Sequence, residues 1–386
     1  MRNLVVGVVV GLVIGVVLGS AIVAPRLKLP AHKTSSQEQD PNITKPASHI
    51  VSAPRLPRKP APVHWRMASA YASQMPQMGE LAQRLDSSIW HLSGGVFRLK
   101  MHEPGTLVPS NQMFDAVRSQ AIDAAFAAPS FWADKNSAFH LFSAIPFGPP
   151  AQEYLSWIFD GGGREIMDEL YKHQGLHGLV CGVIASEGSG WFREPIESLE
   201  AFKALRIGMG GLGGLVAQRL GAKTMNLNEG DVFVALKKVM IDGAEASQPA
   251  VDMNLGLHTI ARHYYFPGWH QPATLLHLIV NGDAWLDLPK SRRTQIDAAC
   301  ASNVAHGLAV GEARQFNALR EFIKQGVRIH TWSPDILVSL EKAWTKTHVD
   351  LAKGNHDFKR VWNSLTKFRE EYAIWREISA GTPMQN

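Results

Sequence analysis

The chain has 386 residues, of which 45% are hydrophobic and 19% are charged, so it can bury a large core and is long enough for two compact lobes. Its formal net charge of +5 comes without a run of Lys and Arg interleaved with aromatic residues in the folded part, which argues against nucleic-acid binding. The two cysteines, Cys181 and Cys300, are too few for a disulfide-dense scaffold and lack the spacing of a metal site.

The first 29 residues predict a membrane anchor or an export signal. Leu4–Ala24 carries no charged residue and is long enough to cross a bilayer as a helix. The segment exceeds the usual apolar core of a cleaved signal, and Gly19-Ser20-Ala21 is its only acceptable cleavage site, so we favour an uncleaved membrane anchor. Arg26 and Lys28 by themselves favour holding that side in the cytoplasm, but large domains often cross regardless.

A Pro-rich stretch separates this segment from the folded part. Residues 30–62 are rich in Pro, Ser, Lys and Gln and have too few apolar side chains for a core, so we expect a disordered linker. Residues 63–378 have the composition of a folded domain with two α/β lobes. Residues 379–386 are expected to form a flexible tail.

Apolar runs of strand length alternate with helical periodicity through the folded part, which predicts an α/β fold class. The predicted strands are Val96–Glu103, Ala121–Ala128, Leu205–Met209 and Leu275–Asn281. The predicted helices include Gly79–Trp90, Asn111–Gln120 and Gly230–Met240. The C-terminal part of the domain is predicted to be largely helical.

One glycine-rich stretch has the pattern of a dinucleotide-binding turn. Residues 208–213, Gly-Met-Gly-Gly-Leu-Gly, match G-x-G-x-x-G between a predicted strand and a helical stretch. That fingerprint usually opens its domain, whereas here it falls past the middle of the folded part with no βαβαβ half before it. A tight strand-to-helix connection, in which glycine allows positive φ or close packing, explains the pattern better. A nicotinamide-dependent dehydrogenase is the less favoured alternative.

Five separated stretches give a more specific signal than the glycine pattern. They are Pro104–Trp132, Ala144–Tyr171, Gly188–Ala222, Gly230–Ala246 and Gly256–Pro272. In this order they resemble the periplasmic solute-binding subunits of tripartite ATP-independent periplasmic (TRAP) transporters. The similarity is greatest to the branch that binds 2-oxo acids and related monocarboxylates.

The resemblance implies a hinged, type II-like receptor with two α/β lobes, joined by crossing strands and a long helix, which close on a small organic acid in the cleft between them. Such a receptor is not an enzyme, and it delivers its solute to the permease subunits in the membrane. No nucleophile or metal-hydrolase spacing occurs among the 16 histidines, so the sequence gives hydrolytic catalysis no support. A membrane-tethered binding or scaffold protein without a transport role is the alternative.

The resemblance also assigns ligand positions, and this chain departs from the family at most of them. A fixed arginine normally clamps the carboxylate of the solute, because the guanidinium matches its two oxygens. Alignment of the flanking stretches without a gap places Gly208 at that position. The other ligand positions are occupied by Glu187, Ala246, Gln271, Phe131 and Trp132.

The family's metal-binding glutamate is retained as Glu245, so the resemblance implies a sodium or calcium ion bound together with the ligand. The loss of the clamp and the gain of Glu187 predict a larger, less positive site that binds a pyruvate-like anion poorly by itself. Glu187 and Glu245 would favour a cationic or zwitterionic ligand, or would hold a divalent ion that recruits an anion. Three arginines are expected to be surface or hinge charges, with a displaced anchor as the alternative role: Arg193, Arg206 and Arg262.

Overall fold

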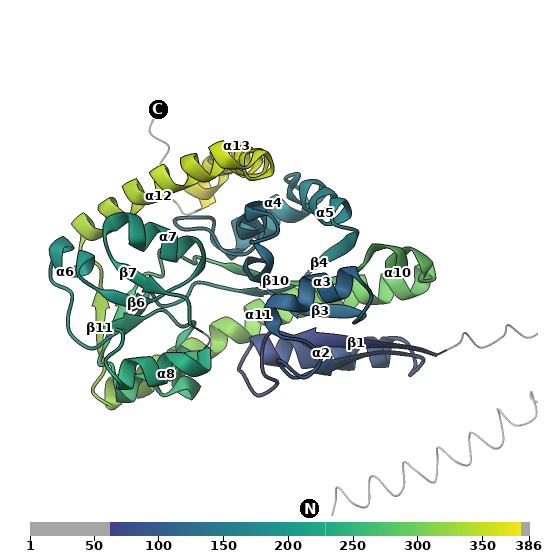
Figure 1. Ribbon diagram of the computed structural model, residues 1–386, viewed down its shortest axis with the longest axis horizontal. Coiled ribbons are helices and arrows are strands. Elements are labelled where there is room, and N and C mark those ends of the chain that lie inside the picture. Colours follow the sequence, from purple (N-terminus) through teal and green to yellow (C-terminus); the bar gives the residue numbers. More distant parts are fainter. Residues whose placement is uncertain (1–61, 228, 380–386) are drawn as a thin grey trace, which may run out of the picture. The chain divides into compact units, whose positions relative to one another are not determined.

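The structure is a computed structural model that describes residues 62–227 and 229–379. The predicted membrane segment, nearly all of the Pro-rich linker and the tail after Ser379 lie outside those residues. The described part consists of two α/β lobes, each built on one β-sheet (Figure 1), which confirms the predicted fold class. Within residues 62–227 and 229–379, none of the helices combines the length and the apolar character that crossing a bilayer requires.

The sheet of the first lobe has five strands in the order β2-β1-β3-β10-β4. They are β1 (Val63–Ser69), β2 (Phe97–His102), β3 (Ala124–Ala127), β4 (Leu176–Ile184) and β10 (Thr274–Asn281). The first three run parallel, whereas β10 lies antiparallel between β3 and β4. Strands β2 and β3 lie inside the ranges predicted from the sequence, and β10 begins one residue before its predicted range.

Helices cover both faces of this sheet, and the residues of β10 alternate between the two faces. Leu276 and Leu278 join the core under α2 (Met78–Leu92) and the first half of α11 (Lys290–Lys324). Leu275 and Ile279 join the core of the opposite face. That face is covered by α3 (Met113–Arg118), α4 (Ala151–Phe159), α5 (Gly163–His173) and the 3₁₀ turns η3 (Ser110–Gln112), η4 (Pro129–Trp132) and η5 (Ser137–Phe142). The short α10 (Gly282–Asp287) follows β10 directly.

The sheet of the second lobe has six short strands in the order β11-β9-β5-β8-β6-β7. They are β5 (Gly190–Phe192), β6 (Arg206–Gly208), β7 (Lys223–Met225), β8 (Gly243–Ala244), β9 (His263–Phe266) and β11 (Arg328–Thr331). β6 pairs in parallel with β7 and β8, and β5 pairs antiparallel with β8 and β9. The helices of this lobe are α6 (Leu199–Lys203), α7 (Gly211–Leu220), α8 (Glu229–Lys237), α9 (Pro249–Leu255) and the 3₁₀ turn η6 (Leu257–Thr259).

The chain passes between the lobes in two extended segments and along a helix. Residues 185–189 join β4 to β5, and residues 267–273 join β9 to β10. Helix α11 contacts β4 and α2 in the first lobe and α9 in the second, and Figure 1 shows it running along both. These connections match the crossing strands and the long helix that the family resemblance implies.

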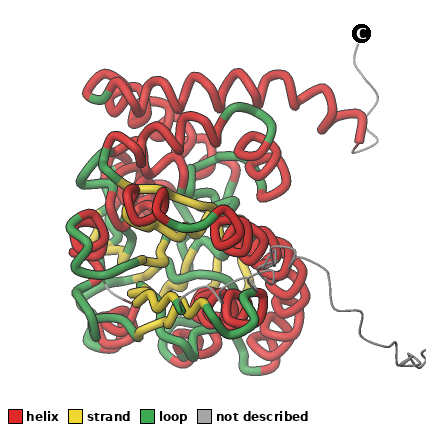
Figure 2. The backbone as a smooth tube through the Cα atoms, turned by 90° about the vertical axis from the view of Figure 1, so that its right-hand side faces the viewer, coloured by secondary structure: helices red, strands yellow, loops and turns green. Residues whose placement is uncertain are grey.

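The last two helices also connect the lobes. Helix α12 (Pro334–Gly354) packs on α7, and α13 (His356–Ser379), the helix that leads to the marked C-terminus in Figure 2, packs on α4, α5 and η5. Glu153 of α4 is fully buried and accepts hydrogen bonds from Arg369 Nε at 2.9 Å and Arg376 Nη1 at 3.0 Å. A buried carboxylate needs such paired cations, because an uncompensated charge is expensive to bury. The pairing therefore fixes α13 on the first lobe.

A disulfide joins the two cysteines of the chain. Cys181 lies in β4 and Cys300 in α11, and both side chains are buried. The link ties the long helix to β4, an edge strand of the first lobe's sheet. No local sequence pattern predicts this pairing, because the two residues are 119 positions apart.

The double variant Cys181→Ala/Cys300→Ala is expected to lower the free energy of unfolding by about 2–5 kcal/mol, since the cross-link closes a long loop in the unfolded chain. Urea denaturation followed by circular dichroism measures the change. Wild-type protein with reduced cysteines is the control and should unfold near the midpoint of the variant. Equal midpoints for the oxidised and reduced wild type would contradict the prediction.

Candidate functional site

The glycine-rich stretch forms a strand-to-helix turn in the second lobe. β6 ends at Gly208, Gly210 is the N-cap of α7, and Gly211 has a φ of +57°. A Cβ on Gly213 would lie 2.9 Å from the Cβ of His270, closer than side chains normally approach. These glycines therefore provide positive φ and close packing, and they place the start of α7 against residues 267–273.

Glu245 stands at the carboxyl end of a strand next to this turn. β6 and β8 are parallel neighbours, but between them the chain first passes through β7 on the other side of β6. Ligands of such sheets bind outside the carboxyl ends of the strands, where successive connections go to opposite sides. Glu245 follows β8 at this position, and its backbone N–H donates to the carbonyl oxygen of Gly208 over 2.9 Å.

Two more polar side chains come from the segments between the lobes. Glu187 lies in residues 185–189 and His270 in residues 267–273, and their exposed fractions are only 5% and 3%. The segments are in close contact, because a Cβ on Gly268 would lie 2.3 Å from the carbonyl oxygen of Glu187. The fold thus brings both side chains beside Glu245.

Glu187, Glu245 and His270 form what we call the carboxylate–histidine cluster. Each offers one ligand atom, and the three atoms lie within 4.8 Å of one another. His270 Nε2 is 3.7 Å from Glu245 Oε1. Ser247 Oγ donates to Glu187 Oε1 at 3.4 Å, and Gln271 Nε2 donates to Glu245 Oε1 at 3.2 Å.

The donors of the cluster suit a cation. Two charged carboxylates whose ligand oxygens lie within 4.8 Å of each other repel by roughly 3 kcal/mol or more at an effective dielectric constant of about 20. A positive ion between them removes this repulsion, and carboxylate oxygens are preferred ligands of hard cations. Glu187 and Glu245 are the residues that would hold such an ion, with Gln271 orienting Glu245.

Asp252 holds the elements around the cluster in place. Its carboxylate accepts hydrogen bonds from Trp191 Nε1 and Tyr264 Oη, each at 2.7 Å, and from the backbone N–H of Ser247 at 3.0 Å. Burial raises the pKa of Asp252 to about 7; these hydrogen bonds oppose the rise, and the charge of Glu245 adds to it. Asp252 therefore joins β5, β9 and the segment after β8.

The clamp position assigned to Gly208 is closed by apolar side chains. A Cβ there would lie 3.2 Å from Ile241 Cδ1, 3.3 Å from Ala244 Cβ and 3.4 Å from Leu227 Cδ1. These contacts leave a side chain at position 208 little room. An arginine side chain would therefore not fit at position 208 unless these neighbours moved.

The three arginines named as displaced anchors donate to other groups. Arg206 Nε donates to Asp242 at 3.0 Å. Arg193 Nη1 donates to the carbonyl oxygen of Leu236 at 3.0 Å. Arg262 Nη1 donates to the carbonyl oxygen at position 325 at 2.7 Å. The observed bonds place all three in structural roles.

The remaining predicted ligand residues are divided between the lobes. Gln271 contacts Glu245, and its Oε1 accepts from Thr274 Oγ1 at 2.7 Å. Ala246 is half-buried and packs on the core of the second lobe. The two aromatic residues, Phe131 and Trp132, belong to the first lobe.

Phe131 and Trp132 differ in exposure. Phe131 is 39% exposed and meets Tyr71 edge to face. Trp132 is 1% exposed, and its Nε1 donates to Tyr171 Oη at 3.2 Å inside the core. The ring and the polar atom of Trp132 are both used in packing, and its assignment as a ligand residue stays a prediction.

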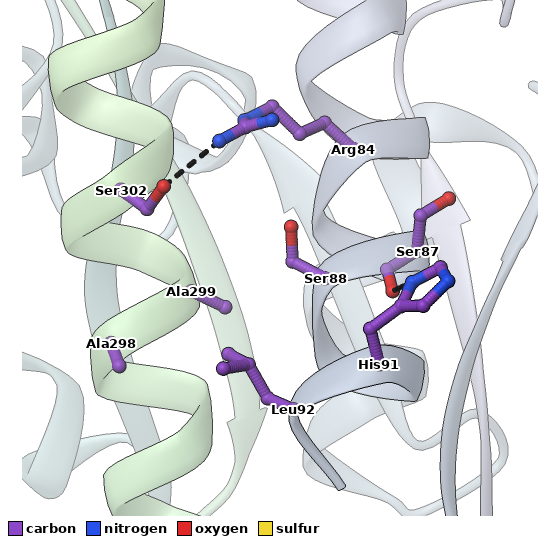
Figure 3. Close-up of a pocket in the computed structure, with 8 residues that line it drawn as sticks. All are labelled: Arg84, Ser87, Ser88, His91, Leu92, Ala298, Ala299 and Ser302. Carbon is purple, nitrogen blue, oxygen red and sulfur yellow. Dashed lines mark hydrogen bonds between the residues drawn. The ribbon is translucent and has the colours of Figure 1, made fainter. Parts of the chain in front are cut away.

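A surface groove lies away from these residues, between α2 and α11 (Figure 3). Arg84 donates across it to Ser302 Oγ at 2.9 Å, and Ala298, Ala299 and Leu92 line its floor and rim. None of the residues predicted to bind a ligand lines this groove. The carboxylate–histidine cluster is the stronger candidate site, since it combines buried charge with donors from three segments.

Comparison with known proteins identifies the family. Residues 67–354 match the bacterial extracellular solute-binding proteins of family 7. The match spans well over half of the chain, so the chain belongs to this family.

Individual relatives agree with this assignment. A monocarboxylate 2-oxoacid-binding periplasmic protein of Nostoc sp. is 27% identical over 317 residues, covering 82% of this chain and 87% of that protein. A TRAP transporter solute-binding protein from Bordetella bronchiseptica, crystallised with calcium and picolinate in its active site, is 30% identical, with a TM-score of 0.81 and coverage of 83% and 96%. A counterpart from Colwellia psychrerythraea with calcium and pyruvate is 25% identical, with a TM-score of 0.78 and coverage of 83% and 98%.

These findings confirm the resemblance to TRAP receptors, and the chain is an extracytoplasmic solute receptor. The buried disulfide agrees with that location, because disulfides persist in oxidising compartments. The expectation that a sodium or calcium ion accompanies the ligand agrees with the calcium-bound relatives. The dehydrogenase and scaffold alternatives are not favoured.

Sequence reasoning missed His270, Ser247 and Asp252. His270 stands directly before Gln271, in a segment already assigned to the ligand, and that adjacency was the one available signal. Ser247 and Asp252 gave none, because their side-chain partners Glu187, Trp191 and Tyr264 come from other segments of the chain.

The variant Asp252→Asn is expected to destabilise the protein more at pH 5 than at pH 8. The folded-state pKa near 7 lies above that of an unfolded aspartate, so the wild type loses stability as pH rises from about 4 to about 7, whereas asparagine cannot ionise. Urea titrations of both proteins between pH 5 and pH 8 measure the difference. A loss of stability in Asp252→Asn that is larger at pH 8 than at pH 5 would contradict the raised pKa of Asp252.

Proposed function

We propose that this receptor binds a small carboxylate together with a cation, and that Glu187 and Glu245 hold that cation. The proposal rests on two carboxylates, the buried Glu187 and the half-buried Glu245, whose ligand atoms lie within 4.8 Å of each other. They lie beside the carboxyl ends of β6 and β8. A cation held there supplies the positive charge that the clamp arginine supplies elsewhere in the family. Gly208 and its apolar neighbours cannot provide that charge.

The solute class is a 2-oxo acid or a related monocarboxylate. Support comes from the relatives that bind picolinate or pyruvate with calcium and from the 2-oxoacid-binding protein of Nostoc sp.. Ala246 has a small side chain at a ligand position implied by the resemblance, which leaves room for a solute bulkier than pyruvate. Phe131 is the proposed aromatic contact from the first lobe, because its ring is 39% exposed.

The proposed activity is binding and delivery, without a bond being made or broken. Gln271 fixes the orientation of Glu245 through a hydrogen bond to its Oε1. Ser247 does the same for Glu187. Release of the solute to TRAP permease subunits in the membrane completes the proposed role.

Isothermal titration of pyruvate and picolinate into the full-length protein, purified in mild detergent, tests the cation requirement. Protein stripped with a chelator is expected to bind neither acid measurably, and restoring divalent cations should restore micromolar binding, with picolinate bound more tightly. Micromolar binding of pyruvate to the stripped protein would defeat the proposal. Binding of a cationic or zwitterionic amine to the stripped protein would also defeat it.

The variant Glu245→Gln should weaken solute binding at least about 30-fold, because loss of one buried charge partner costs roughly 2 kcal/mol or more. Glu197→Gln, an exposed glutamate of the same lobe, is the matched control and should bind like the wild type. Equal affinity of the two variants would contradict the role of Glu245.

We further propose that residues 1–29 anchor the receptor in the inner membrane. The support is the uncharged stretch Leu4–Ala24, whose length suits a bilayer-spanning helix. Full-length protein expressed in a Gram-negative host should stay in the membrane after a carbonate wash, and replacing residues 1–29 with a cleavable signal should release it into the periplasmic fluid. An intact mass that begins after residue 21 would show cleavage and overturn the proposal.

A further inference from the structure

His270 is the member of the cluster whose role the proposed function leaves open. Its side chain is 2% exposed, and neither Nδ1 nor Nε2 has a hydrogen-bond partner within the described part of the chain. A buried polar atom without a partner costs about 1–3 kcal/mol, and such groups in native proteins are nearly always paired. A group bound at the cluster is therefore expected to satisfy the ring.

The backbone holds His270 against the rest of the cluster. Its Cβ packs against Gly213 at the start of α7, and Trp269 meets its ring edge to face. The distance of 3.7 Å from His270 Nε2 to Glu245 Oε1 is too long for a hydrogen bond. It is close to the separation of roughly 3.4 Å between two ligands of one tetrahedral ion with bonds of about 2.1 Å.

The chemistry of the three donors distinguishes between classes of cation. Sodium and calcium take oxygen ligands, whereas imidazole nitrogen suits zinc and neighbouring transition metals. Imidazole nitrogen and carboxylate oxygen are both zinc ligands, and three protein ligands leave a fourth position of a tetrahedral ion open for another molecule. His270 thus fits sodium or calcium less well than it fits a transition metal.

We infer that Glu187, Glu245 and His270 form a three-ligand site for a divalent transition-metal ion of the zinc class. The inference rests on the proposed function, because it concerns the same cation site and names the ion. The open fourth position accepts the carboxylate of the solute. Bidentate acids that can chelate such an ion are the favoured solutes.

The test uses metal ions alone, without solute, on the chelator-stripped full-length protein. Competition titrations with a fluorescent chelator measure the affinities for zinc and calcium in the wild type, in His270→Gln and in His258→Gln. His258 is a buried histidine of the same lobe outside the cluster, so its variant is the matched control.

Wild type is expected to bind zinc at least about 100-fold more tightly than calcium. His270→Gln should lose about 100-fold in zinc affinity while its calcium affinity changes less than about 3-fold. His258→Gln should behave like the wild type. Equal loss in both variants, or unchanged zinc affinity in His270→Gln, would overturn the inference.

X-ray absorption of the zinc-loaded wild type gives a second readout that needs no variant. One imidazole nitrogen at about 2.0 Å supports the site, and a shell of oxygen atoms alone overturns it. Calcium-dependent solute binding combined with an oxygen-only zinc shell would reject this inference and leave the proposed function intact. Absence of any cation binding would reject both.

Discussion

The side-by-side passage of two chain segments between the lobes is the constraint on which the rest of the site depends. Residues 185–189 and 267–273 pack so closely that a Cβ on Gly268 would lie 2.3 Å from the carbonyl oxygen of Glu187, which requires glycine there. This contact places Glu187 and His270 on neighbouring backbones. The parallel pairing of β6 and β8 then adds Glu245 from the sheet of the second lobe. Three sequence-distant residues become one cluster because glycine at position 268 allows the two segments to approach this closely.

Local sequence patterns predicted the longer and more regular elements of the fold. Strands β2, β3 and β10 and helix α2 carry apolar residues at the expected spacing, and they formed where that spacing indicated. The two-residue β8 has no pattern of its own, because its pairing depends on β5 and β6. The pairing of Cys181 with Cys300 likewise depends on the contact of α11 with β4, which no local pattern encodes.

Family resemblance predicted part of the candidate site. Glu187, Glu245 and Gln271 were named from aligned positions, and the structure places them together. Trp132 was named in the same way, but it serves the core of the first lobe. An aligned position does not show whether the side chain there is buried in the core. His270 was passed over for a related reason, since the absence of hydrogen-bond partners for its ring among the described residues is a tertiary property.

The disulfide between β4 and α11 has a mechanical consequence. Cys300 lies in the first third of a 35-residue helix, and the covalent link prevents that part of the helix from sliding along β4. The remaining turns reach the second lobe, where Gln315 donates to Gln248 at the start of α9. Helix α11 is thus held by a disulfide to the first lobe near its start and by a hydrogen bond to the second lobe further along. A displacement of the second lobe would therefore act on the far end of α11, whereas the disulfide would hold the first third of the helix on β4.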